Sequence, residues 1–426
     1  MTAGRGGWIG FYRRVLARRR GDEPGGLDLR LVTLAMTLTV ACTMPLWLLG
    51  ALSVQMRAEL DYSIIALGGA VALQRLGGAL LSLPFGRLAD RWGPTPAMRV
   101  AALIAAVAGF GIAALATEYW ILAVFLLVSG GANALGQTAA NLALVRAVPY
   151  TRQGTAFGIK QSALPVGSMV AGLTVPLLAL TIGWRYAFVL AGLIALIVLV
   201  WVPRGRSERY ERPAGVTNRV RGRGPLLVLA VGLFFGMAAA TGLTTFIVEA
   251  ATDAGVSPAQ AGLLLTLGSI CSIVTRLIAG RLADRRGGRH LITVARMQLT
   301  GMFGLALIAS GRPALMLVGA MVAFSFAWGF NGVFWFAIVR LSPATPAAAS
   351  GTVMPGGMLG GVAGPLVFGW VAETFGFATA WLTAASWSLA AGLLMLLGRR
   401  LLRASLAAGD LAQAAEAAER PTPAER

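Results

Sequence analysis

The sequence predicts an all-α integral membrane protein with twelve transmembrane helices, arranged as two six-helix bundles related by a parallel pseudo-two-fold axis. Three observations predict this fold class. The chain is 57% hydrophobic and 12% charged, with a mean hydropathy of +0.74, far outside the composition of soluble domains. Apolar runs of about twenty residues, the length of one helical crossing of a bilayer, recur along the chain. The hexapeptide Gly-Arg-Leu-Ala-Asp-Arg occurs twice, at Gly86–Arg91 and Gly280–Arg285, each time after an apolar run.

Apolar runs fill the first half of the chain. They are rich in Gly, Ala and Leu and lack the period-2 alternation of transmembrane strands, so each is expected to form a helix. After a polar N-terminal tail at residues 1–30, these helices form the first bundle, residues 31–203. Their expected ranges are 31–52, 63–85, 97–116, 119–145, 154–182 and 185–203.

The second half repeats this pattern after a polar, arginine-rich linker at residues 204–224. The second bundle is expected over residues 225–398, and a polar C-terminal tail over residues 399–426. Its expected helices cover residues 225–248, 258–279, 290–310, 313–339, 348–371 and 377–398.

The arginines indicate the orientation in the membrane. With the N-terminus in the cytoplasm, thirty arginines lie on that side and only Arg57, Arg185 and Arg312 on the other. Basic residues concentrate in cytoplasmic loops, so we expect a multi-pass protein of the cell membrane with both termini cytoplasmic. The net charge of +19 is then mostly a topology signal, and no nucleic-acid partner is expected. Because both hexapeptides lie on one side, each half contains an even number of helices.

The hexapeptides and the residues after them resemble the loop signature of the major facilitator superfamily, between helices 2 and 3 and between helices 8 and 9. The first copy reads Gly-Arg-Leu-Ala-Asp-Arg-Trp-Gly and the second Gly-Arg-Leu-Ala-Asp-Arg-Arg-Gly. The first departs from the family pattern at Pro94 and Thr95, where a basic pair is usual. The resemblance covers about residues 31–398. It implies an alternating-access carrier of a small solute, with a central cavity between two six-helix bundles.

The same resemblance implies that the two loops form a gate. Asp90 would bind near the start of helix 11 and Asp284 near the start of helix 5, where arginines and free helix N–H groups stabilise a carboxylate. The glycines would allow a tight turn and the close approach of a neighbouring helix. The alternative is that both loops are plain basic topology anchors. The expected gate residues are Gly86, Asp90, Arg91, Gly93, Gly280, Asp284, Arg285 and Gly287.

A polar stripe runs along helix 4. Asn133, Gln137 and Asn141 are spaced by four residues and therefore share one helix face. On helix 10, Asn331 and Trp335 occupy symmetric positions. Because helices 4 and 10 face the cavity in this family, we expect these residues to line it. The alternative is polar glue between packed helices.

Two cations lie deep in the predicted helices. Lys160, the only lysine, is about 12 Å beyond Arg152 at 1.5 Å per residue, beside Gln161; Arg75 lies beside Gln74 on helix 2. No acidic residue occurs at comparable depth, so we expect Lys160, Gln161, Arg75 and Gln74 to bind an anionic substrate. The alternative is that Lys160 extends to the inner face or is neutral. Arg276, four residues before Gly280, is expected to be structural.

The predicted function is secondary active transport of a small organic anion such as a carboxylate. The alternatives are a proton-coupled exporter of drugs or metabolites, and a non-transporting sensor or scaffold with the carrier fold. No enzyme is expected, because no catalytic set, cofactor motif or metal-ligand cluster stands out in the sequence. A proton is the candidate coupling ion. Glu249 could carry it, but we favour a solvated loop charge beside Asp253. A monomer in the lipid bilayer is expected.

Overall fold

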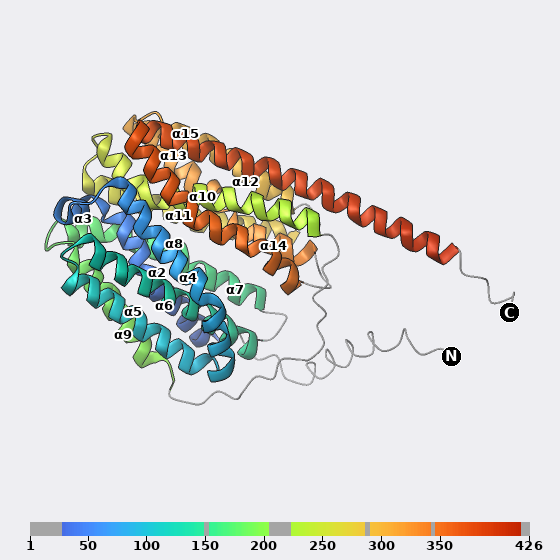
Figure 1. Cartoon of the computed structure of the whole chain (residues 1–426), viewed down its shortest axis with the longest axis horizontal. Coiled ribbons are helices and arrows are strands. Elements are labelled where there is room, and N and C mark those ends of the chain that lie inside the picture. Colours follow the sequence, from blue (N-terminus) through green and yellow to red (C-terminus); the bar gives the residue numbers. More distant parts are fainter. Residues whose placement is uncertain (1–27, 149–152, 204–222, 286–289, 342–345, 419–426) are drawn as a thin grey trace.

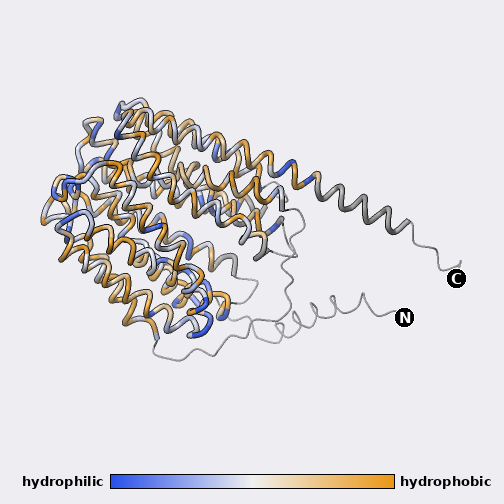
Figure 2. Tube along the Cα trace, viewed as in Figure 1, coloured by the Kyte–Doolittle hydropathy of each residue, from blue (hydrophilic) through white to orange (hydrophobic). Residues whose placement is uncertain are grey.

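The computed structural model describes residues 28–148, 153–203, 223–285, 290–341 and 346–418, and these residues form helices and short connections without any strand (Figure 1). Hydrophobic residues dominate the helices (Figure 2), and many large apolar side chains are exposed on their outer faces. An apolar exterior of this kind suits lipid and not water. The prediction of an all-α membrane protein is confirmed.

The described part of the first half contains eight α-helices and one π-helical turn, and most of the breaks between them are short. Asp28 caps the first helix by accepting hydrogen bonds from the N–H groups of Arg30 and Leu31 at 3.1 and 3.2 Å. The elements are α2 (Leu29–Ala51), α3 (Ser53–Leu60), α4 (Ile64–Trp92), α5 (Pro94–Leu115), α6 (Tyr119–Ala147), α7 (Gln153–Gln161), α8 (Ala163–Thr174), η2 (Val175–Ala179) and α9 (Arg185–Trp201).

The second half contains α10 (Arg223–Asp253), α11 (Pro258–Arg285), α12 (His290–Ile308), α13 (Pro313–Ala323), η3 (Phe324–Trp328), α14 (Asn331–Leu341) and α15 (Pro346–Ala418). Ten described helices are long and apolar enough to cross a membrane. Within α15, two helices meet at Gly376, which has φ +83°. The count of twelve needs α15 as two crossings and the shorter α9 as another, and it stays a prediction.

Two details of the chain differ from the sequence expectations. The hexapeptides are not loops: α4 continues through Gly86–Arg91 to Trp92, and α11 continues through Gly280 to Arg285. Leu, Ala and Arg are good helix formers, which explains why both segments stay helical. After the first hexapeptide the chain turns only at Gly93, which has φ +83°. Residues 399–418, expected as part of a tail, extend α15. The expected tail at residues 1–27 and the linker at residues 204–222 lie outside the described residues, and the domain boundaries stay predictions.

The two ends of the molecule differ in how the halves meet. We call the end where α4 and α11 finish the hexapeptide end, and the end that carries α3 the opposite end; α7 and α14 lie toward the hexapeptide end (Figure 1). Toward the opposite end the halves pack backbone to backbone. A Cβ added to Gly68 of α4 would lie 2.2 Å from the carbonyl oxygen of Pro365, and one added to Gly172 of α8 would lie 2.6 Å from that of Gly262.

The apolar cores give the same result. The largest core contains residues of both halves, among them Leu48 of α2, Phe246 of α10 and Trp381 of α15. A second core, which includes Leu38 and Ala139, belongs to the first half alone. A third core, which includes Leu229 and Val353, belongs to the second half alone. The halves therefore share one core toward the opposite end and keep separate cores toward the hexapeptide end.

Candidate functional site

Lys160 lies inside the first bundle, and its ammonium group is held by α6. It sits one residue before the end of α7, and the helix is interrupted at Ser162 before α8 begins. Its side chain has no exposed surface, so it does not extend to the inner face. Nζ donates hydrogen bonds to Oε1 of Gln137 and, at 3.1 Å, to Oδ1 of Asn141. The structure thus brings together three residues of the predicted site.

The contacts of Lys160 are polar but neutral. Two amide oxygens solvate the ammonium group without adding negative charge, and the sequence has no Asp or Glu between Glu118 and Glu208. A charged lysine in an apolar interior favours a counter-ion. Gln161, the next residue, is exposed and takes no part in these hydrogen bonds.

Arg75 and Gln74 occupy the middle of α4, where it packs against α6 and α15. Gln74 is fully buried, and neither atom of its amide group has a partner among the described residues. Arg75 points toward the second half: its Cδ would lie 3.8 Å from a Cβ added to Gly361 of α15. Its buried Nε–H has no acceptor in the described part of the chain. Both residues therefore carry unused hydrogen-bonding capacity inside the membrane.

The remaining polar residues of the predicted site are partly buried. Asn133 lies one turn before Gln137, and its Oδ1 has no described partner. In the second half, Nδ2 of Asn331 contacts Sδ of Met237 at 3.4 Å, while its Oδ1 has no described partner. Trp335 packs edge-on against Phe334 at 5.5 Å. None of these three is hydrogen-bonded to the Lys160 cluster.

Sequence reasoning did not identify the partner of Arg276. It was expected to be structural, and its Nη2 donates a hydrogen bond to the carbonyl oxygen of Trp328 at 3.1 Å. The guanidinium carbon lies 5.2 Å from the centre of the Trp328 ring. Trp328 also lies 5.5 Å from Trp47 of the first half. The signal that could have placed Arg276 was its two-turn distance from Asp284, too far for a direct pair.

The gate residues are described only in part. Gly93 makes the turn after α4, Arg91 is exposed, and half-buried Asp90 has no ion pair with a described residue. No described atom lies within 4 Å of a Cβ added to Gly86 or Gly280, so none of the described helices makes the expected close approach at these two glycines. Three parts of the predicted gate lie outside what the structure describes: the side chains of Asp284 and Arg285, the whole of Gly287, and the side chains at the start of α15. The start of α15 is where Asp90 was expected to bind.

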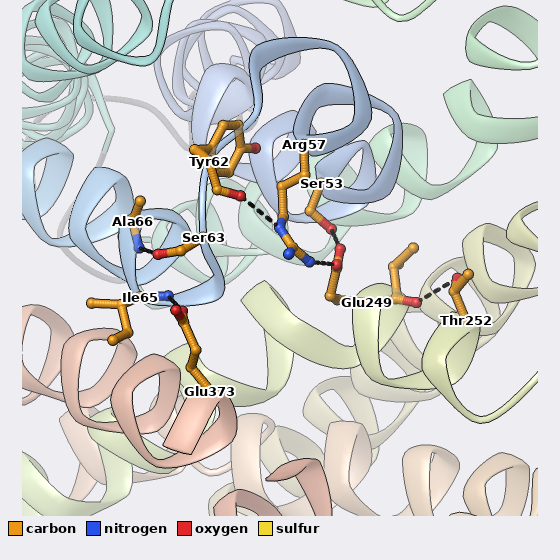
Figure 3. A network of polar contacts seen from close by, with 10 residues as sticks. Ser53, Arg57, Tyr62, Ser63, Ile65, Ala66, Glu249, Thr252 and Glu373 are labelled. Carbon is orange, nitrogen blue, oxygen red and sulfur yellow. Dashed lines mark hydrogen bonds and ion pairs between the residues drawn. The ribbon is translucent and has the colours of Figure 1, made fainter. Parts of the chain in front are cut away.

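Polar contacts join the halves at the opposite end (Figure 3). Glu249 of α10 forms an ion pair with Arg57 of α3 and accepts a hydrogen bond from Oγ of Ser53 at 2.8 Å. Glu373 of α15 accepts a hydrogen bond from the N–H of Ile65 at 2.8 Å. The interpretation of Glu249 as a solvated loop charge is wrong: the residue is 8% exposed, because α10 continues to Asp253 and holds it against α3.

Ion pairs are few in the described part of the chain. The two formed between described residues, Arg57–Glu249 and Arg185–Glu59, lie at the opposite end. Lys160, Arg75 and Arg276 therefore form a set of three cations within the apolar helices, none paired with a described carboxylate. We call these residues the cationic set.

Comparison with known proteins identifies the class. The model of the Major Facilitator Superfamily matches residues 31–353 and 229–420, and the chain belongs to this family of membrane transporters. It is 24% identical over 334 residues to the multi-drug resistance efflux pump PmrA of Streptococcus pneumoniae, covering 73% of this chain and 80% of that protein. It is 28% identical over 341 residues to the probable nitrate/nitrite transporter NarK2 of Mycobacterium tuberculosis, covering 76% and 84%.

A solved structure agrees in fold. The nucleoside transporter NupG superposes with a TM-score of 0.69 at 18% identity, covering 88% of this chain and all of that chain. At this identity the likeness concerns the fold alone. The protein is thus a multi-pass secondary transporter of the major facilitator superfamily.

Proposed function

We propose that this transporter carries a small organic anion such as a carboxylate, by alternating access between its two halves. The observation that carries this proposal is the cationic set. Lys160, Arg75 and Arg276 lie within the apolar helices, and their described partners are neutral amide oxygens, a carbonyl oxygen and an aromatic ring. Ionisable residues inside a membrane are expensive and mark substrate pathways. A bound anion would supply the charge that the protein lacks.

The arrangement of the halves supports an inward-facing state. The thirty-to-three distribution of arginines favours the cytoplasm for the hexapeptide end and for both termini. The shared core and the Arg57–Glu249 pair then seal the outer end, and the separate cores lie on the cytoplasmic side. Asn133 of α6 and Asn331 of α14 would line the path, since their amide oxygens are buried without described partners and can solvate a substrate.

Similarity to NarK2, which its name describes as a nitrate/nitrite transporter, supports an anionic substrate. Similarity to PmrA, named as a drug efflux pump, favours the second candidate, a proton-coupled exporter. The two candidates differ in the charge of the ligand, which a binding experiment can measure directly.

A thermal-shift screen of the purified protein tests the proposal, because a ligand that binds only the native state raises the melting temperature. We expect stabilisation by nitrate, acetate or benzoate. We expect none by tetraphenylphosphonium or glucose. Lys160→Gln and Arg75→Gln should weaken the anion response. Arg312→Gln, which removes an exposed cation at the opposite end, should leave it unchanged. Stabilisation by lipophilic cations alone, insensitive to Lys160→Gln, would contradict the proposal and favour the exporter.

A further inference from the structure

The tenth predicted helix is irregular in the middle of its span. Regular helix α13 passes into the π-helical turn η3, which ends at Trp328, and helix resumes only at Asn331. π-Helical turns are rare and concentrate at functional sites. Irregular backbone at membrane depth occurs where it is buried in protein or lines a water-filled space. The break leaves the carbonyl oxygen of Trp328 to accept the 3.1 Å hydrogen bond from Arg276.

Arg276 approaches Trp328 in two ways and still has a donor unused. Its guanidinium carbon lies 5.2 Å from the centre of the indole ring, within the range of a cation–π contact, and Nη2 binds the carbonyl oxygen. Its Nε–H is buried and has no acceptor among the described residues. Arg276 therefore fixes the ring of Trp328 and presents a free hydrogen-bond donor beside it.

Trp47 completes the arrangement from the first half. Its side chain is 5% exposed, its indole N–H has no described acceptor, and its ring lies 5.5 Å from that of Trp328 at an interplanar angle of 60°. A Cβ added to Gly167 of α8 would lie 2.8 Å from Cδ1 of Trp47, so α8 packs directly against the indole. A buried tryptophan N–H usually finds a partner, and this one has none in the described structure.

We propose that Trp47, Arg276 and Trp328 form an aromatic subsite and that the transported anion is an aromatic carboxylate. The inference rests on the proposed function and specifies the substrate of the same site. Because Trp47 and Trp328 belong to different halves, movement of the halves separates the two rings and opens space for a planar ring between them. The free N–H groups of Trp47 and Arg276 donate to an oxygen atom of the substrate. The positive charge of the cationic set offsets the carboxylate.

Binding of three matched compounds to the purified full-length protein tests this inference. Benzoate carries a ring and a charge, cyclohexanecarboxylate has the same charge without an aromatic ring, and benzamide is neutral and aromatic. An aromatic contact contributes about 0.5–1.5 kcal/mol beyond buried area, so benzoate should bind about two- to tenfold more tightly than cyclohexanecarboxylate. Trp328→Leu and Trp47→Leu should each remove this preference and leave the affinity for cyclohexanecarboxylate nearly unchanged.

The control is Trp370→Leu, at a ring that is 51% exposed on α15; it should keep the preference. Trp328→Phe retains an aromatic ring and should keep most of it, which separates recognition from loss of folding. Equal affinity for the two carboxylates, or a preference that survives both leucine variants, would overturn the aromatic subsite while leaving an anion carrier. Equal binding of benzamide and benzoate, or no binding of either carboxylate, would overturn the anion carrier and with it this inference.

Discussion

The carboxylate of Glu249 in α10 is paired with the guanidinium of Arg57 in α3, across the boundary between the two halves (Figure 3). The pair is further connected: Nε of Arg57 donates to the carbonyl oxygen of Tyr62 at 3.0 Å, and Ser53 donates to Glu249. Burial raises the pKa of the Tyr62 phenol. A contact between halves that exists only when one end is closed stabilises that conformation over the other. The Arg57–Glu249 pair is therefore expected to bias the transporter toward closure of the opposite end.

Replacing Glu249 tests this bias. Glu249→Gln keeps the shape of the side chain but removes its negative charge. The donors of Arg57 and Ser53 then lose about 1–3 kcal/mol of interaction with this side chain. The population with the opposite end open should rise by about fivefold to a hundredfold. Spin labels at Glu118 and Arg312, exposed positions at that end in the two halves, would report it as a longer distance in pulsed electron resonance, in a background without Cys42 and Cys271.

The matched control is Glu59→Gln. Glu59 also pairs with an arginine at the opposite end, but its partner, Arg185, belongs to the same half. Breaking this pair should not change the distance between halves. An equal response of the two variants would mean that charge at this end, and not the contact between halves, controls the conformation.

Close packing of α4 against α15 gives a second prediction. Gly68→Ala places a Cβ 2.2 Å from the carbonyl oxygen of Pro365, which the backbone must relieve by separating the halves. Overpacking of this kind is destabilising by about 1–3 kcal/mol, here specifically for the closed opposite end. The same spin labels should report opening.

Gly69→Ala is the control for this second prediction, because it brings the same gain in helix propensity as Gly68→Ala. Its added Cβ would lie 3.2 Å from the hydroxyl oxygen of Tyr119, which belongs to the first half. If both alanine variants leave the distance distribution unchanged, the contact between Gly68 and Pro365 does not limit opening.

Much of the fold could be predicted because it depends on local chemistry. The length of the apolar runs and the repeated hexapeptide are enough for an all-helical, duplicated membrane protein. What could not be predicted depends on packing between distant segments. The burial of Glu249 requires α3, 192 residues away, to lie against α10. The helical state of the hexapeptides is compatible with their composition, but the glycines and charges of these segments are equally common in turns.

The candidate site was predictable to a similar degree. The spacing by four of Gln137 and Asn141 places them on one face of α6, and both bind Lys160. The sequence does not show which face of α7 meets that stripe, so Gln161, adjacent to Lys160, was included although it is exposed. Arg276 and Trp328 were missed as a pair because the π-helical turn η3 interrupts the regular helix between α13 and α14, and no residue type signals such a turn.

The gate implied by the family resemblance gives a third prediction. Asp90 is half-buried near the end of α4, and the resemblance implies that it binds near the start of helix 11 when the hexapeptide end closes. Asp90→Asn and Asp284→Asn should each favour the state in which that end is open. Labels at Arg30 and Arg400, exposed residues near that end, should show a larger fraction of the long distance. An unchanged distribution in both variants would leave the hexapeptides as plain topology anchors.

The last prediction supplies Lys160 with a permanent counter-ion. Gln137→Glu is nearly isosteric and puts a carboxylate where the ammonium group now donates to an amide oxygen. At an effective dielectric constant of about 20, two charges 4 Å apart attract by about 4 kcal/mol. An internal carboxylate would therefore compete with a substrate anion for Lys160. The melting temperature of the ligand-free protein should stay the same or rise, while anion affinity falls about tenfold or more. Asn133→Asp, one turn away and not bonded to Lys160, adds the same charge and should have a smaller effect. If Gln137→Glu binds anions as tightly as the wild type, Lys160 is not the group that holds the substrate.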